Sequence, residues 1–335
     1  MSSNKKQFNS KTILITGGAG FIGSNLALHI QNQYPKSKVV VFDYFQNHNR
    51  ADLIKSYGHF KNLIGFNGDL ICGDLNSNSD FEKLDEYKFD IIFHKAAISD
   101  TRENNQEAIM KTNVNSFYDI LELTKKNNAR LIYASSGATY GDAISPQSVG
   151  KENPGNAYGF SKYLMDQIAN RYLNENPGLK IFGLRYFNVY GPGEFFKGKT
   201  SSMIVQLAHQ ILQGKNPRLF NNSDQIFRDF IYIEDVVQSN INACNSNLSG
   251  VYNIGSGIAR SFQEVCDILQ KELNTNLEIE YFTNPYSDYQ THTQANITSS
   301  VDNLNFNPKY SLESGIKKYI PEINKLYESE FHERT

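Results

Sequence analysis

The sequence has no tryptophan and only three cysteines among its 335 residues, and long apolar runs are also missing. Cys72, Cys244 and Cys266 are odd in number and widely spaced, without a C-x-x-C pair. This usage argues against a disulfide framework and predicts reduced thiols in a cytoplasmic protein. No stretch approaches the ~18 apolar residues that a membrane-spanning helix needs. Residues 1–10 are polar, lack the apolar core of a signal peptide, and are expected to form a short disordered leader.

An excess of charge of either sign is missing as well. The 33 basic and 35 acidic residues leave a net charge of −2, which gives no basis for binding nucleic acid or a membrane surface. The seven histidines are dispersed and none has metal-ligand spacing to a partner, so no metal site is predicted. What the chain does have is 39% hydrophobic residues, with 22 Phe and 20 Tyr, enough for a sizeable core.

Short apolar, β-branched runs alternate with helical stretches through the first half of the chain. Runs without polar alternation suit strands that are buried on both faces of a parallel sheet. The expected strands are 12–16, 39–43, 70–74, 90–97, 130–136 and 180–186, and the expected helices are 21–33, 107–126 and 157–174. This order predicts an α/β fold with a doubly wound parallel Rossmann sheet.

The strand-helix rhythm breaks after about residue 190. Helices are expected at 200–213 and 262–272, a short segment at 218–220, and strands at 228–233, 251–255 and 277–282. We therefore expect a Rossmann domain over 11–188 plus about 229–256. A smaller interleaved α/β substrate-binding lobe would take 189–228 and about 257–325, and the two would share one cleft.

A glycine-rich turn follows the first expected strand and opens the first helix. Gly17, Gly20 and Gly23 form G-x-x-G-x-x-G, which permits a sharp turn, lets a pyrophosphate approach bare backbone and aims a helix N-terminus at it. Asp43 ends the next strand, about 20 residues on, and suits a ribose hydroxyl. These features predict dinucleotide binding. Asp43 favours NAD, whereas Arg50 could offset its charge beside a 2′-phosphate, so both cofactors stay open.

Tyr158 and Lys162 form a Y-x-x-x-K pair on one face of an expected helix. A phenol is a poor base at neutral pH because its pKa is about 10, and a neighbouring ammonium is expected to lower that pKa. Ser136 ends a strand at the edge where ligands bind in open α/β sheets, and its hydroxyl can orient a reacting hydroxyl. Together with the glycine turn, these residues predict hydride chemistry on a carbinol carbon.

Several segments carry a family resemblance, namely TGGAGFIGSN, YASSGATYG, YGFSK, RYFNVYGPGE and RDFIYIEDV. They resemble the extended short-chain dehydrogenase/reductase family of nucleotide-sugar enzymes, from about residue 11 to about residue 320. More selective segments are FFKG at 195–198, PRLF at 217–220 and YQTHTQA at 289–295. They look like the ADP-glyceromanno-heptose 6-epimerases of that family. The resemblance implies epimerisation of an ADP-heptose at C6 by transient oxidation, in a cytoplasmic homo-oligomer that serves lipopolysaccharide synthesis.

The resemblance also implies roles for individual residues. Tyr158 and Lys197 would be the two acid/base groups, with Ser136 orienting the reacting hydroxyl and Lys162 serving both catalysis and the cofactor. The other expected cofactor-binding residues are Gly17, Gly20, Phe21, Ile22, Gly23, Asp43, Tyr44, Arg50, Asp74, Lys95, Ala96, Ala97, Ser99 and Asn113. The expected substrate-binding residues are Asn188, Lys199, Gln206, Phe220, Ser223, Arg228 and Tyr289.

Two positions depart from the family pattern. Tyr44 follows Asp43 where relatives often carry a Lys or Arg, which weakens a preference for a 2′-phosphate. Arg102 stands where a smaller residue is usual and could reshape the sugar pocket. We expect one tightly bound NADP per subunit, with NAD as the alternative.

The same scaffold can support other reactions. A 4,6-dehydratase would need an acid and a base beside the serine strand, and Ser136-Gly137-Ala138 supplies neither. A nucleotide-sugar 4-epimerase, or a net 4-dehydrogenase acting on a related nucleotide heptose, remains open. A non-catalytic binding protein is disfavoured because Ser136, Tyr158 and Lys162 occur together.

Overall fold

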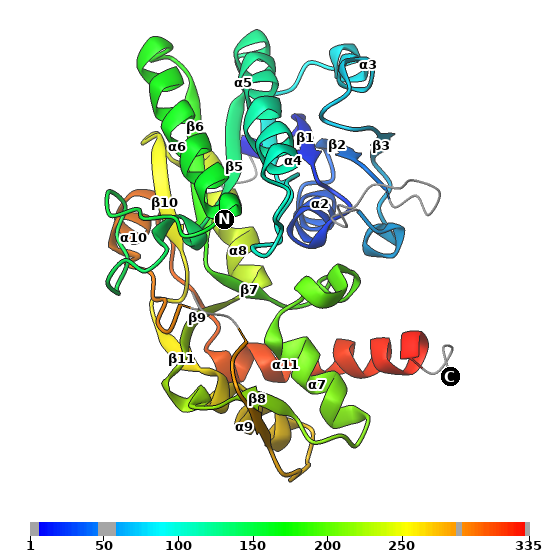
Figure 1. Cartoon of the computed structure of the whole chain (residues 1–335). Helices are drawn as coiled ribbons and strands as arrows, with labels where there is room; N and C mark the ends of the chain where they lie inside the picture. The colour runs from blue at the N-terminus through cyan, green and yellow to red at the C-terminus, as the bar shows by residue number, and fades with distance from the viewer. Residues whose placement is uncertain (1–6, 46–57, 286–289, 332–335) are drawn as a thin grey trace.

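The computed structural model describes residues 7–45, 58–285 and 290–331. A seven-stranded sheet has the order β10-β6-β5-β4-β1-β2-β3, and every neighbouring pair is parallel (Figure 1). Its strands are β1 (Thr12–Thr16), β2 (Lys38–Asp43), β3 (Asp69–Cys72), β4 (Ile91–His94), β5 (Arg130–Ser136), β6 (Lys180–Tyr186) and β10 (Gly250–Ile254). The strand order reverses between β1 and β4, which confirms the predicted doubly wound Rossmann sheet.

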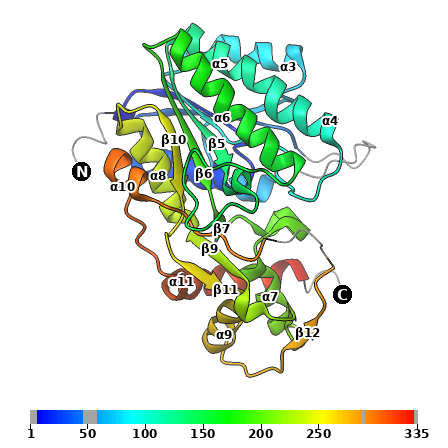
Figure 2. The same ribbon diagram turned by 60° about the vertical axis from the view of Figure 1, so that its left-hand side comes forward.

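The strands read as continuous apolar runs because both of their faces are buried. In β1, Ile13 and Ile15 belong to one core cluster and Leu14 to another, and all three side chains are inaccessible to solvent. Helices α2 (Phe21–Gln33) and α8 (Ile233–Asn245) pack in the first cluster. Helices α5 (Ser116–Asn127) and α6 (Ala157–Glu175) cover the opposite face (Figure 2).

The helix expected at 107–126 is interrupted. It consists of α4 (Gln106–Ile109), the π-helical segment η3 (Met110–Asn115) and α5. The wider π turn turns Asn113 inward, where its amide hydrogen-bonds Ile98 and Ser161. The remaining short helices around the large sheet are η1 (Phe60–Leu63), α3 (Asn78–Phe81), η2 (Glu82–Glu86) and η4 (Gly137–Tyr140).

Two small sheets lie beyond the carboxyl ends of the large one. One has the order β11 (Ala259–Ser261), β9 (Phe227–Tyr232), β7 (Asn188–Tyr190), and the other pairs β12 (Glu280–Phe282) with β8 (Arg218–Phe220). We expected the β9 segment to belong with the large sheet. It pairs instead with β7 and β11, because the chain leaves the large sheet after β6 and continues into β7.

Helices pack around the small sheets and between them and the large one. They are η5 (Phe195–Thr200), α7 (Met203–Leu212), η6 (Ser223–Gln225), α9 (Phe262–Glu272), α11 (Leu312–Leu326) and η7 (Tyr327–Phe331), whereas α10 (Thr298–Leu304) packs on β10 and α8 at the edge of the large sheet. Helix α9 begins at a capping box in which Ser261 and Glu264 satisfy each other's backbone N–H groups. Among the described helices, none combines the length and apolar character needed to cross a membrane.

Residues 7–10 differ from the disordered leader expected over 1–10. Phe8 is fully buried and stacks on Tyr34 with ring centroids 4.5 Å apart. The Gln7 side chain donates a hydrogen bond to the Cys244 carbonyl on α8. Burial of one aromatic ring stabilises by about 2 kcal/mol, which favours packing of this segment against α2 and α8.

Candidate active site

A cleft of about 2680 Å³ opens at the carboxyl ends of the large sheet, between it and the small sheets. Pockets for one drug-sized molecule measure about 300–1,000 Å³, so this cleft has room for two nucleotide-sized ligands. The predicted site residues that line it are Gly17, Gly20, Phe21, Ile22, Gly23, Asp43, Tyr44, Asp74, Lys95, Ala96, Ala97, Ser99, Ser136, Tyr158, Lys162, Asn188, Lys197, Lys199, Gln206 and Arg228.

Five predicted residues stand apart from that set. Asn113, Phe220 and Ser223 do not line the cleft among the described residues. Asn113 and Ser223 are buried, and Phe220 packs edge-to-face on Phe282. Arg50 and Tyr289 lie outside the residues that the structure describes.

The glycine turn brings backbone close to backbone at the start of α2. Gly17 has a φ of +67°, and a Cβ there would lie 2.5 Å from the Ala96 nitrogen. A Cβ on Gly23 would lie 2.1 Å from the Gly17 carbonyl oxygen. Gly20 is the N-cap residue of α2 and has no side chain that could accept a hydrogen bond from the first turn. The first backbone N–H groups of α2 are therefore available to a ligand in the cleft. This cradle fits a pyrophosphate.

Asp43 closes the far end of the cradle. Its carboxylate accepts hydrogen bonds from the Ala19 and Tyr44 backbone N–H groups, each at 2.7 Å. Burial nonetheless raises the pKa of Asp43 to about 7, with the backbone hydrogen bonds opposing the shift. Each carboxylate oxygen has a second lone-pair direction, so the group can also accept from ribose hydroxyls.

The Tyr158/Lys162 pair stands at the first turn of α6. Asn156 caps this helix by accepting from the Gly159 N–H at 2.8 Å. The Lys162 Nζ donates to the Ala134 carbonyl at 2.9 Å and lies 5.9 Å from the centre of the Tyr158 ring. Burial lowers the pKa of Lys162 to about 8.

Our expectation that Lys162 lowers the pKa of Tyr158 is wrong for the chain alone. Burial raises the pKa of Tyr158, and only a hydrogen bond with Ser136 acts in the opposite direction. A neutral phenol is the favoured form, because desolvation penalises the phenolate more than the surrounding groups stabilise it. A bound cationic nicotinamide ring would add the stabilisation that the protein lacks.

Lys197 lies on η5, which reaches the cleft from the small-sheet side. Its Nζ lies 5.7 Å from the centre of the Phe21 ring and remains open to the cleft. The surrounding protein lowers the pKa of Lys197 by desolvation, while Glu194 and Asp100 oppose that shift. Lys197 therefore loses its proton more readily than an ordinary lysine.

Glu194 is an active-site neighbour that the sequence reasoning missed. It is fully buried and accepts from the Gly191 N–H at 3.0 Å, the Ser202 N–H at 2.5 Å and the Ser202 hydroxyl at 2.9 Å. These bonds tie together the two ends of the segment that carries Lys197. Its place beside the GPG turn of the RYFNVYGPGE segment was the available signal.

Two predicted cofactor residues have other contacts than expected. Lys95 directs its Nζ to the Ile132 carbonyl and the Tyr186 hydroxyl, both at 3.1 Å. Burial pushes the pKa of Lys95 well below its usual range. Asn113 uses its amide on Ile98 and Ser161. Lys95 therefore lines the cleft, and Asn113 holds the backbone of Ile98, another lining residue, without lining the cleft itself.

Arg228 on β9 lies on the small-sheet side of the cleft, and Arg102, in the segment between β4 and α4, lies on the large-sheet side. Arg228 donates to the Phe227 carbonyl at 2.8 Å and to the Gln290 carbonyl at 2.6 Å, so part of its donor set holds backbone. Arg102 pairs with Asp100 at 3.1 Å and reaches the Lys199 carbonyl at 3.4 Å. The unusual arginine thus contacts the η5 segment across the cleft.

The chain belongs to the NAD dependent epimerase/dehydratase family, whose model matches residues 13–255. Within that class, it is 36% identical over 323 residues to an ADP-L-glycero-D-manno-heptose-6-epimerase from Brachyspira hyodysenteriae, covering 93% of this chain and 98% of that one. The crystal structure of the Helicobacter pylori ADP-L-glycero-D-manno-heptose-6-epimerase matches with a TM-score of 0.87 and 46% identity, over 95% of this chain and 97% of that one. The Thermotoga maritima UDP-glucose 4-epimerase matches with a TM-score of 0.84 and 25% identity, over 94% and 99%.

Proposed function

We propose that this protein interconverts ADP-D-glycero-D-manno-heptose and ADP-L-glycero-D-manno-heptose. The observation that carries the proposal is the meeting of two proton-transfer groups in one cleft, Tyr158 from α6 and Lys197 from η5. Epimerisation through a ketone requires proton handling on two faces of one carbon, and a single tyrosine serves one geometry. The names of the two heptose-epimerase relatives supply the substrate.

The residues divide the reaction between them. A nicotinamide cofactor bound over the glycine turn supplies reversible hydride transfer at C6. Tyr158 removes the C6 hydroxyl proton while Ser136 holds that hydroxyl, and Lys162 would hold the cofactor beside them. After the 6-keto sugar turns in the cleft, Lys197 protonates or deprotonates the oxygen in its second orientation.

The nucleotide part of the substrate would lie toward the small sheets. Asn188, Gln206 and Arg228 line that side of the cleft, and Lys199 adds a positive charge. Arg228 is buried, and its guanidinium, which donates to the Phe227 and Gln290 carbonyls, brings the positive charge that suits a diphosphate to this side of the cleft. We propose that this side, built from residues 189–228 and about 257–325, is the nucleotide-sugar lobe, with Tyr289 also contributing.

We propose that the cofactor is NADP or NAD, bound tightly enough to be regenerated in place. Asp43 would repel a 2′-phosphate when ionised, but its pKa of about 7 leaves much of it neutral near neutral pH. The site would then accept either NADP or NAD, and the ratio of their affinities would depend on pH through the ionisation of Asp43. Arg50 would accompany a 2′-phosphate.

We further propose a homo-oligomer that works in the cytoplasm. Tyr118 on α5 and Phe160 on α6 are exposed large side chains on one helical layer of the sheet, which suits contact with a second copy. All three cysteines are free thiols, as in a reducing compartment. Light scattering after size exclusion of the wild type and of Phe160→Glu tests the first point.

The deciding experiment incubates purified protein with ADP-D-glycero-D-manno-heptose, without added cofactor, and follows the C6 proton by NMR. A mixture of both C6 epimers is expected from the wild type, and no mixture from Tyr158→Phe. Absence of conversion by the wild type, even with NAD or NADP added, would overturn the proposal. Net formation of a 4-keto sugar would instead indicate 4-oxidation.

A further inference from the structure

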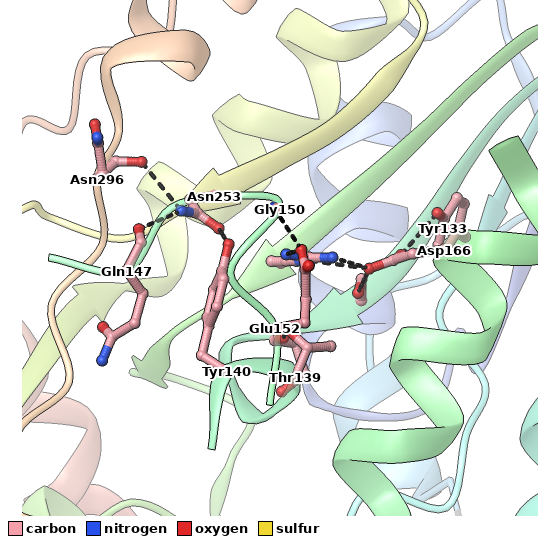
Figure 3. A network of polar contacts seen from close by, with 12 residues as sticks. Tyr133, Thr139, Tyr140, Gln147, Gly150, Glu152, Asp166, Asn253 and Asn296 are labelled. Atoms are coloured by element: carbon pink, nitrogen blue, oxygen red, sulfur yellow. Dashed lines mark hydrogen bonds and ion pairs between the residues drawn. The ribbon is translucent and has the colours of Figure 1, made fainter. Parts of the chain in front are cut away.

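A buried ionic network lies directly behind the catalytic helix (Figure 3). Arg185 on β6 is 1% exposed, and its guanidinium contacts Asp166 at 2.8 Å and Glu152 at 2.5 Å. Asp166 on α6 is equally buried and also accepts from the Tyr133 hydroxyl at 2.8 Å and the Ser135 hydroxyl at 2.9 Å. Buried charges cost several kcal/mol each unless they are paired and hydrogen-bonded, and here each is.

Three consecutive residues of β5 contact three residues of α6. The Ala134 carbonyl accepts from Lys162, the Ser135 hydroxyl donates to Asp166, and Ser136 hydrogen-bonds Tyr158. Tyr158, Lys162 and Asp166 follow one another at four-residue intervals, so they lie along one face of the helix. A rotation or slide of α6 against β5 would break all three contacts together.

We propose that Asp166 is a positioning residue: it fixes α6 on β5 and presents the negative charge that faces the catalytic Lys162, with Arg185 holding its carboxylate in place. This inference rests on the proposed role of Lys162. Neither Asp166 nor Arg185 lines the cleft among the described residues. Both therefore act through Lys162 and Tyr158 rather than on the substrate.

Charged and titratable groups face Lys162 from each element packed against it. His94 ends β4, Lys95 follows it, and Tyr158 and Asp166 come from α6 itself, whereas Tyr133 on β5 and Arg185 on β6 act on Asp166. Lys95 carries positive charge or none, and burial keeps the pKa of His94 far below its usual value. Asp166 is the group whose charge raises the pKa of Lys162 against desolvation. Without that charge, the pKa of Lys162 would fall further below its usual value.

The test compares Asp166→Asn, Asp166→Glu and the matched control Glu175→Gln, which removes an exposed carboxylate from the same helix. The titration of Lys162 is followed by NMR of protein labelled with ¹³C at lysine Cε, without substrate, and the alkaline limb of the kcat profile is recorded in parallel. Asp166→Asn should lower the Lys162 midpoint by ~1 pH unit or more, the usual effect of one nearby opposite charge. Asp166→Glu should restore it, and Glu175→Gln should leave it unchanged.

An Asp166→Asn midpoint equal to that of the wild type would overturn the proposal, as would an equal shift in Glu175→Gln. If Asp166→Asn does not fold, Glu152→Gln takes its place, because Glu152 ends the same network on a partly exposed loop. It should move the midpoint in the same direction by a smaller amount, and no movement would overturn the proposal. The NMR titration is done without substrate, so it tests the role of Asp166 even if the proposed substrate is wrong.

Discussion

Two lysines of the cleft, Lys162 and Lys197, differ in how the protein holds them. Lys162 stands on a 19-residue helix, donates to the Ala134 carbonyl and has Asp166 one turn behind it. Lys197 stands on the six-residue η5, open to the cleft, and the segment around it is held at its ends by Glu194. Desolvation by the surrounding protein lowers the pKa of both lysines. The helix side thus holds its lysine by contacts within the protein, whereas the lysine of the η5 side is exposed on a short helical segment.

This contrast matches the work proposed for each side. The cofactor is proposed to stay bound from cycle to cycle, so the lysine beside it does not need to move during the reaction. The 6-keto sugar has to turn between two hydride transfers, so the group meeting its second orientation benefits from a loop position. Four predictions test the comparison, from the largest expected effect to the smallest.

Tyr158→Phe should remove the phenol and leave the helix side otherwise intact. We expect kcat to fall by about 10³-fold, within the range for loss of one acid/base group. Cofactor absorbance should persist in the purified protein, since Lys162 and the glycine turn remain. Loss of bound cofactor together with activity would mean that Tyr158 serves binding rather than proton transfer.

Lys197→Met and Lys162→Met should separate the two lysines. Both variants should lose about 10²-fold in kcat, but only Lys162→Met should purify with little cofactor. Quantifying the cofactor released by acid denaturation measures the difference. Equal retention by both variants would contradict the division of the cleft into a cofactor side and a substrate side.

Much of the helix side could be predicted from sequence, because its signals are local. Strands β1, β5 and β6 and helices α2 and α9 match the expected ranges residue for residue. Their apolar runs are bounded by turn or capping residues, and Tyr158 and Lys162 need only a helical register to meet. The glycine turn likewise depends on contacts within one strand-turn-helix unit.

What escaped prediction depends on distant partners. Phe8 is buried because Tyr34 and α8 cover it. The pairing of β9 with β7 follows from the chain leaving the large sheet after β6. Helix α11 contains Pro321, a residue that ordinarily argues against a helix interior. The direction of the Tyr158 pKa was wrong because burial cannot be read from spacing alone.

Glu194→Gln should loosen the η5 side alone. The amide keeps the size of the carboxylate but can accept at only one oxygen, so the contacts to Gly191 and Ser202 weaken. We expect kcat to fall by about tenfold through displacement of Lys197, with cofactor content unchanged. A matched control is Asp235→Asn, which weakens the contacts of another buried carboxylate to the Lys309 and Tyr310 backbone N–H groups, none of which lines the cleft. An equal loss of kcat in the control would point to general destabilisation.

The smallest effect concerns the choice of cofactor on the helix side. Asp43 has a pKa of about 7 in the folded chain, so it is largely neutral below that pH and largely ionised above it. The repulsion of a 2′-phosphate therefore grows as pH rises, and the ratio of NADP to NAD affinity should fall about fivefold between pH 6 and 8. This ratio can be measured by calorimetric titration of protein from which the cofactor has been removed. In Asp43→Asn, the ratio should no longer depend on pH, apart from the effect of the phosphate's own ionisation near pH 6. If the ratio of NADP to NAD affinity is the same in the wild type and in Asp43→Asn at every pH, Asp43 does not face the 2′ position. The distinction between the cofactors would then depend on residues beyond Tyr44.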